Sequence, residues 1–244
     1  MTALDHYSLA VIRQLEQIHS TQRAEIELAA ALFAEALLNE RWLYAFGTGH
    51  SHMVAEEVFY RAGGLARAVP ILDGKLMLHE SASESTEVER RENYAAGLLE
   101  SYPLAAGDVL LIASNSGRNP VPIDLALAAR ERGVKVVAIT NLQHTKIWPS
   151  RHSTGKKLVD LADVAIDNCG VPGDACVELP ELSTLAGPTS TIAGAFIVNL
   201  LVVQAIENVL AKGVIPEVYT SSNTGSDAHN ERLLAKYKGR IRHL

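Results

Sequence analysis

The sequence predicts an α/β fold, a three-layer sandwich in which helices cover both faces of a five-stranded parallel sheet. Two observations lead to this prediction. Short apolar runs alternate along the chain with longer segments whose apolar residues recur at helical spacing. The short runs contain no alternating polar positions, which is typical of parallel strands that are buried on both faces. The length of 244 residues suits one domain of this kind.

The elements can be followed in chain order. Residues 4–39 contain no glycine or proline and predict one long helix, or two helices joined near His19–Thr21. The run RWLYAFG predicts a first buried strand that ends at Gly47, and the helix after it is expected to end at Gly63–Gly64. The further predicted elements are a strand over 65–72, a polar stretch and then a helix over 73–102, a strand over 108–114, a helix over 121–133, a strand over 134–140, a polar loop over 141–157, a fifth strand over 162–168, a loop with a short edge strand over 170–179, a long helix over 189–211 and a last helix over 226–238.

Composition and charge exclude several classes of protein. Hydrophobic residues make up 48% of the chain, which is enough for a sizeable core, and the net charge is −6 without a basic stripe. We therefore expect no nucleic-acid partner. The longest apolar window, TIAGAFIVNLLVVQAIENVL, is interrupted by Asn199, Gln204, Glu207 and Asn208, which favours a buried helix over a membrane span. The first residues lack the apolar core of a signal peptide, so we expect a soluble, cytoplasmic protein.

Two loops that follow predicted strands share an unusual composition. Both GTGHS, residues 47–51, and SNSG, residues 114–117, combine glycine with small hydroxyl side chains and lead into a helix. Ligands of doubly wound sheets bind beyond the carboxyl ends of the strands, and a helix start offers N–H groups and a dipole that favour anions. One such loop could be only a tight turn. Two of them predict a phosphate site.

Other readings of the first loop fit less well. The dinucleotide-binding motif GxGxxG requires a third glycine where His52 stands, so we expect no nicotinamide or flavin cofactor. His50 and His52 do not share a helical face, and the spacing of His52 and Glu56 is common by chance. Cys169 and Cys176 are spaced CxxxxxxC, with no second pair. We therefore expect no metal site.

Three segments in order resemble the motifs of sugar isomerase (SIS) domains. GTGHSHMVAEEVFYRAG resembles their first motif, GxGxS, and LLIASNSGRNPVPIDLALAARERGVKVVAIT resembles the second, an S-x-S-G-x-T loop with the following helix and strand. AGPTSTIAGAFIVNLLV is similar to the Ser/Thr-rich start of their late helix. The chain is most similar to single-domain bacterial SIS-domain phosphosugar-binding proteins. The resemblance implies a flavodoxin-like single domain, with a helical arm over residues 1–39, a core over 40–212 and a C-terminal loop and helix over 213–244.

The resemblance also implies a phosphosugar whose phosphate is held by the two serine loops. The implied positions are Gly47, Gly49, His50, Ser51, Ser114, Asn115, Ser116, Gly117 and Asn119. Asn119 stands where the second motif usually has threonine, and His50 is bulkier than the usual occupant of its position. Thr189 and Ser190 either cap the long helix or reach the same ligand.

Interconversion of an aldose and a ketose moves a proton between C1 and C2 and requires an acid and a base. Glu80, in LMLHES after the second strand, is the first candidate, because several SIS enzymes carry a catalytic glutamate at this place. The further candidates are His79, Glu57 and His229. His229 is included because related enzymes bring in a histidine from a late or neighbouring-subunit segment. The alternatives are an exposed first-turn glutamate for Glu80, a salt-bridged helix residue for Glu57 and a structural role for His79.

The resemblance implies a cofactor-free aldose–ketose phosphosugar isomerase. The alternatives are a non-catalytic sugar-phosphate sensor and a lyase or etherase that acts on an amino-sugar phosphate. The long apolar helices over residues 4–39 and 189–211 have more apolar face than one small sheet can bury. They predict a homodimer or homotetramer with its sites near the interface.

Overall fold

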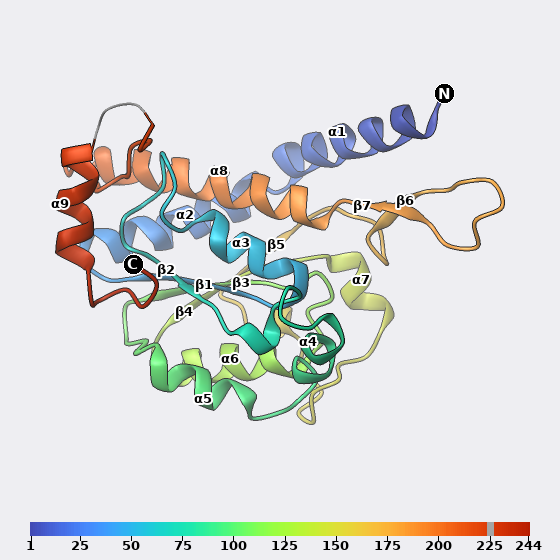
Figure 1. The fold of residues 1–244 in the computed structure, drawn as a ribbon, viewed down its shortest axis with the longest axis horizontal. Coiled ribbons are helices and arrows are strands. Elements are labelled where there is room, and N and C mark those ends of the chain that lie inside the picture. The colour runs from blue at the N-terminus through green and yellow to red at the C-terminus, as the bar shows by residue number, and fades with distance from the viewer. Residues whose placement is uncertain (224–226) are drawn as a thin grey trace.

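The five-stranded parallel sheet is present in the computed structural model, which describes residues 1–223 and 227–244. The strand order is β2-β1-β3-β4-β5, with every pair parallel, so the flavodoxin-like prediction is confirmed (Figure 1). The strands are β1 (Leu43–Gly47), β2 (Ala68–Ile71), β3 (Val109–Ala113), β4 (Lys135–Thr140) and β5 (Val164–Asp167).

Helices cover both faces of the sheet. Successive side chains of one strand therefore belong to two separate hydrophobic cores. Leu43 and Ala45 of β1 belong to the core beneath α2 (Arg23–Leu38), α3 (His52–Glu57) and α8 (Ser190–Leu210). Tyr44 and Phe46 belong to the core on the other face, beneath α5 (Tyr94–Ser101) and α6 (Pro120–Glu131). Because side chains alternate across a strand, burial on both faces makes the whole strand apolar, as the sequence shows.

Helix α8 is long and apolar enough, by length and composition alone, to cross a membrane. In this fold it lies along α2 and over the sheet (Figure 1). Ile197 and Leu201 of α8 are fully buried in the same core as Phe33 of α2. The apolar character of α8 is therefore that of a core helix, as the sequence predicts.

The N-terminal segment forms two helices, α1 (Ala3–Thr21) and α2, joined at Gln22. Helix α2 is part of the body, whereas the first half of α1 projects from it (Figure 1). Beside α1 projects a hairpin of β6 (Ala175–Val177) and β7 (Ala186–Pro188), fixed at its base by the Tyr7 hydroxyl, which donates to the carbonyl oxygen of Pro188 at 2.8 Å. The short strand predicted within residues 170–179 is present as β6, but it belongs to a separate two-stranded sheet with β7 and does not lie at the edge of the five-stranded sheet.

The helix after the first loop is shorter than predicted. α3 ends at Glu57 and does not reach Gly63. The backbone of residues 63–66 pairs instead with residues 217–219, where Gly63 N donates to the carbonyl oxygen of Tyr219 at 2.8 Å. This long-range pairing overrides the local helical pattern. The remaining short elements are the 3-10 turns η1 (Gly49–Ser51), η2 (Gly74–Leu76) and η3 (Leu158–Asp160) and the helices α4 (Ala82–Val88), α7 (Leu142–Ile147) and α9 (Asp227–Tyr237). The start predicted for the last helix, residue 226, lies outside the described residues.

Candidate functional site

The first serine loop turns back sharply on the end of β1. A Cβ atom at Gly47 would lie 2.2 Å from the carbonyl oxygen of Ser51, so only glycine fits there. The turn is closed by His52, whose Nδ1 atom contacts the carbonyl oxygen of Gly49. His52 is buried, whereas His50 is exposed. His52 therefore has a structural role at the start of α3, and Ser51 is left at the edge of the sheet.

The second serine loop is held in place by the ends of the neighbouring strands. The Ser114 hydroxyl accepts a hydrogen bond from Gly117 N at 3.2 Å, which closes the loop on itself. Gly117 has a φ of 59°, and a Cβ atom there would lie 2.9 Å from Oγ1 of Thr140. The side chain of Asn115 accepts from Nδ2 of Asn168, beyond β5, at 2.8 Å. The loop geometry is thus fixed by β4 and β5 without a ligand.

The carboxylate of Asp174 caps the start of α8. Asp174 accepts hydrogen bonds from the backbone N–H groups of Thr189, at 3.0 Å, and Ser190, at 2.8 Å. Its second oxygen accepts from the Ser190 hydroxyl at 2.7 Å. Thr189 is the N-cap residue but its side chain makes no capping hydrogen bond. The capping alternative for Thr189 and Ser190 is therefore replaced by capping from Asp174.

These three segments meet in one small pocket at the carboxyl edge of the sheet. Its lining includes Ser51 of the first loop, Ser114 and Asn115 of the second, and Ser190 and Thr191 of α8. The pocket lies where β1 and β3 are neighbours and the connections run off in opposite directions, the usual ligand position in such sheets. The other predicted positions are not among its lining residues: Gly47, Gly49, His50, Ser116, Gly117, Asn119 and Thr189.

A carboxyl group that the sequence did not single out links the two loops. Glu89, directly after α4, accepts hydrogen bonds from the Thr48 hydroxyl and from the side-chain amide of Asn119. The oxygen of that amide accepts from Nη1 of Arg151 at 2.8 Å. Burial raises the pKa of Glu89, and the Thr48 hydrogen bond and the charges of Arg90 and Arg151 oppose this rise. A carboxyl with a raised pKa that is hydrogen-bonded to both loops is suited to acid–base chemistry.

Nothing local in the sequence marks Glu89. It lies in STEVERREN, where the density of charge is typical of an exposed segment. Its partners Thr48 and Asn119 are 41 and 30 residues away in the chain. The sequence points to this position only through the two serine loops, because Glu89 accepts a hydrogen bond from each of them.

The structure places Glu80 and His79 beside the first loop but facing solvent. The Glu80 side chain is 64% exposed and lies 3.7 Å from Nε2 of His79. The His79 ring centroid is 6.1 Å from that of His52. Glu80 is thus exposed, as the alternative to a catalytic role predicts, but it precedes α4 and is not in its first turn, because the N-cap is Ser81.

Glu57 and His229 lie away from the pocket. Glu57, on α3, forms an ion pair with Arg61 and accepts a hydrogen bond from Asn199 of α8 at 2.7 Å. Nε2 of His229 lies 2.8 Å from the carbonyl oxygen of Val218, whose backbone pairs with Leu65 ahead of β2. Within its own chain His229 is therefore at the opposite edge of the sheet from the pocket.

Known proteins resemble this chain in sequence and in fold. The sequence profile of the SIS domain matches residues 6–141. The chain belongs to the SIS-domain family. Two relatives align with this SIS domain over nearly its whole length: a protein of Caldanaerobacter subterraneus, 44% identical over 99% of this chain and 100% of its own, and one of Listeria monocytogenes, 42% identical over 98% and 97%. Both are named UPF0309 proteins, a name that assigns no activity.

Solved structures share the fold of this SIS domain at low sequence identity. The phosphoheptose isomerase GmhA of Neisseria gonorrhoeae has a TM-score of 0.53 and 18% identity, over 83% of this chain and 95% of its own. A phosphoheptose isomerase of Francisella tularensis has a TM-score of 0.54 and 16% identity, over 84% and 98%. Within residues 1–223 and 227–244, no three His, Cys, Asp or Glu side chains are grouped to hold a metal ion.

Proposed function

We propose that this SIS domain binds a phosphosugar at the pocket and interconverts its aldose and ketose forms without a cofactor. The observation that carries the proposal is the meeting of both serine loops and the start of α8 in one pocket, with the Glu89 carboxyl hydrogen-bonded to each loop. The reaction requires anion binding and proton transfer. The hydroxyl-rich pocket would supply the first, and the carboxyl with the raised pKa would supply the second.

The phosphate would be held by hydroxyl and N–H donors of the two loops. Ser51, Ser114 and Thr191 line the pocket with hydroxyl groups, whereas the Ser190 hydroxyl, which also lines it, already donates to Asp174. The first N–H groups of α8 are already taken by Asp174, so the dipole of α8 contributes less than at an open helix start. The serine loops are therefore expected to supply most of the phosphate affinity.

Glu89 is our candidate for the proton-transfer group. In its ionised form it would remove the proton at C2 of an open-chain aldose phosphate while O1 takes up a proton from solvent, which gives an enediol. It would then return its proton at C1 while O2 releases its proton to solvent, which gives the ketose. Its hydrogen bonds from Thr48 and Asn119 hold it at the junction of the loops. Glu80 remains the candidate that the sequence predicts, and the two glutamates can be tested against each other.

The binding step can be tested by a thermal-shift screen of phosphosugars. We expect at least one to raise Tm of the wild-type chain, and the Ser114→Ala, Ser116→Ala double variant to lose that shift. Ser183→Ala, on the exposed tip of the β6–β7 hairpin, is the matched control and should keep it. A shift that persists undiminished in the double variant would rule out the serine loops as the phosphate site.

The catalytic step can be tested in heavy water with a phosphosugar that binds. An isomerase gives the ketose product, with deuterium at the exchanged carbon unless the proton is transferred internally. Tight binding with neither product nor exchange would assign the chain to the sugar-phosphate sensors. Release of an ether substituent from an amino-sugar phosphate would assign it to the etherases.

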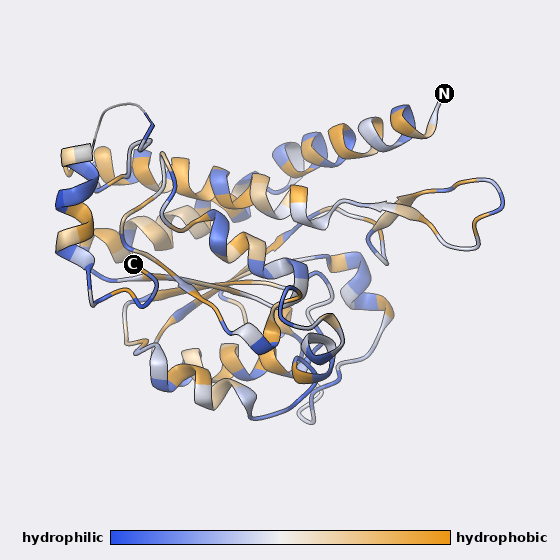
Figure 2. Cartoon of the chain, viewed as in Figure 1, coloured by the Kyte–Doolittle hydropathy of each residue, from blue (hydrophilic) through white to orange (hydrophobic). Residues whose placement is uncertain are grey.

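We also propose that two copies associate through the uncovered faces of α8 and α1. On α8, Ile192, Val203 and Leu210 are 40%, 66% and 50% exposed. On α1, Leu4 and Ile12 are 74% and 51% exposed, and Figure 2 shows apolar turns along the projecting helix.

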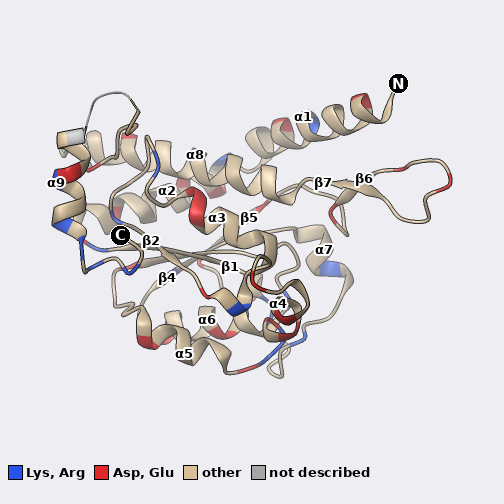
Figure 3. Ribbon diagram, viewed as in Figure 1, with Lys and Arg blue, Asp and Glu red and all other residues tan. Residues whose placement is uncertain are grey.

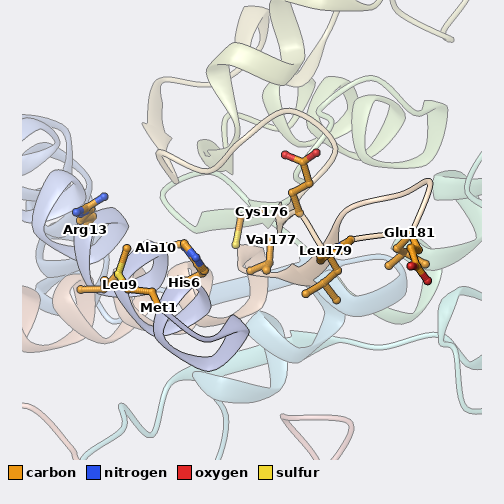
Figure 4. Close-up of a pocket in the computed structure, with 12 residues that line it drawn as sticks. Met1, His6, Leu9, Ala10, Arg13, Cys176, Val177, Leu179 and Glu181 are labelled. Carbon is orange, nitrogen blue, oxygen red and sulfur yellow. The ribbon is translucent and has the colours of Figure 1, made fainter.

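A pocket separates α1 from the hairpin, where Met1 and Leu9 face Val177 and Leu179 (Figure 4). A projecting helix with so much apolar surface is not stable alone in water, and a second copy would cover it.

A further inference from the structure

Three arginines surround the junction at Glu89. Arg90 follows it directly in the chain, Arg118 belongs to the second serine loop, and Arg151 lies in the loop after α7. Nη1 of Arg151 donates to Oδ1 of Asn119 at 2.8 Å, and its backbone N donates to the carbonyl oxygen of Arg118 at 2.9 Å. The charges of Arg118 and Arg90 both lower the pKa of Arg151, after the larger effect of burial. The charges of Arg90 and Arg118 thus act on Arg151, and we refer to the three residues as the cationic cluster.

One carboxylate, that of Glu89, interacts with the charges of Arg90 and Arg151 in this cluster of three cations. In the part of the chain that the structure describes, none of the three arginines forms an ion pair. The other neighbouring acids are engaged elsewhere. Glu92 accepts from the backbone N and the hydroxyl of Ser153, both at 2.6 Å, and Asp124 lies 2.8 Å from Nε2 of His152. Figure 3 shows basic residues among the loops next to α4.

The cationic cluster is also held in place without a ligand. Nε of Arg118 donates to the carbonyl oxygen of Pro149 at 2.8 Å. The loop that carries Arg151 is pinned by the Ser150 hydroxyl, which donates to the carbonyl oxygen of Lys156 at 2.6 Å, and by the pair of His152 and Asp124. Positive groups that are fixed before binding cost little reorganisation when an anion arrives.

We propose that Arg118 and Arg151, with Arg90, bind a second anionic group of the ligand, so that the substrate is a phosphosugar with a carboxylate or a second phosphate. This rests on the proposed function for the first phosphate, which the serine pocket holds. Grouped, unpaired guanidinium groups repel one another, and their planar forks match the oxygens of a carboxylate or phosphate. Glu89 balances one of these three charges, and a sugar with only ring hydroxyls beyond its phosphate would leave the other two unbalanced.

The substrate class can be tested by titration calorimetry with three probes. These are fructose 6-phosphate, 6-phosphogluconate and fructose 1,6-bisphosphate. We expect the wild type to bind one of the two doubly anionic probes at least tenfold more tightly than fructose 6-phosphate, and the tighter probe distinguishes a carboxylate from a second phosphate. Arg118→Ala and Arg151→Ala should abolish the difference and leave Kd for fructose 6-phosphate within about twofold. Arg132→Ala, an exposed arginine at the end of α6, is the control.

Two outcomes would overturn the inference. Equal loss of affinity for all three probes in the arginine variants would place the arginines in the first phosphate site. Equal wild-type affinity for all three probes would show that the cluster binds no second anion. Arg118→Lys guards against misfolding, since it keeps the charge but not the fork and should retain part of the preference.

A separate measurement does not depend on sugar binding. In the Ser114→Ala, Ser116→Ala variant the serine pocket is disabled, and millimolar inorganic phosphate should still raise Tm through the cationic cluster. Adding Arg118→Ala and Arg151→Ala should remove that shift, at an ionic strength matched with chloride. If phosphate stabilises both variants equally, the cluster is not an anion site, whatever the outcome for phosphosugars.

Discussion

Glu89 is the residue at which the two serine loops meet, because Thr48 and Asn119 donate to its carboxyl group from opposite sides. We expect Glu89→Gln to lower kcat for isomerisation by roughly 10²- to 10⁴-fold, the usual contribution of a general acid–base group. KM should change little, because Gln keeps the shape and one of the two acceptor oxygens. Steady-state kinetics of Glu80→Gln provide the comparison. A larger loss in that variant would return the role to Glu80.

The same carboxyl should make the stability of the fold depend on pH. Burial raises the pKa of Glu89 above the ordinary 4.5, so the folded chain favours the protonated form. The stability linked to this group is present below that ordinary pKa and is lost as the pH rises through the raised one. Relative to Glu89→Gln, the wild type should therefore lose free energy of unfolding across this window. Urea titrations of both proteins at a series of pH values measure it, and a constant difference would contradict the expected pKa.

At the scale of an element, helix α8 depends on Asp174 for its first N–H groups. Asp174→Ala removes three hydrogen bonds and places alanine at a φ of 75°, so we expect a loss of about 2 kcal/mol in the free energy of unfolding. Asp174→Asn keeps an acceptor and tolerates this φ, and it should lose about half as much. Urea unfolding of both variants measures the difference. An alanine variant as stable as the wild type would show that other groups cap the helix.

The elements could be predicted where the cause is local. The strands are buried on both faces, so each one appears in the sequence as an apolar run, and the loops with Ser51 and Ser114 follow directly from strand ends. Helix α3 and strand β6 were predicted less well, because residues 63–66 pair with residues 217–219 and β6 pairs with β7. Glu89 could not be predicted either, because its contacts are also long-range in the sequence. Its role comes from partners brought close only by the fold, while its own neighbours are charged and typical of a surface.

At the scale of the whole molecule, the uncovered face of α8 predicts self-association. Val203→Glu puts a charge on the most exposed apolar position of that face and should cost about 2 kcal/mol of association, which raises Kd roughly thirtyfold. Light scattering coupled to size-exclusion chromatography would show the shift towards monomer. Ile147→Glu, at an exposed apolar site on α7, is the matched control and should leave the mass unchanged. An unchanged mass for Val203→Glu would exclude this face as the interface.

Helix α2, early in the chain, packs against helix α8, late in the chain. Together they cover one face of the sheet. During synthesis, Leu43, Ala45 and Leu111 on that face can be covered by α2 and α3 alone until α8 has left the ribosome. Contacts of such long sequence separation slow folding. The nascent chain should therefore complete its fold only after most of it has been made, and it is during this interval that it should depend most on chaperones.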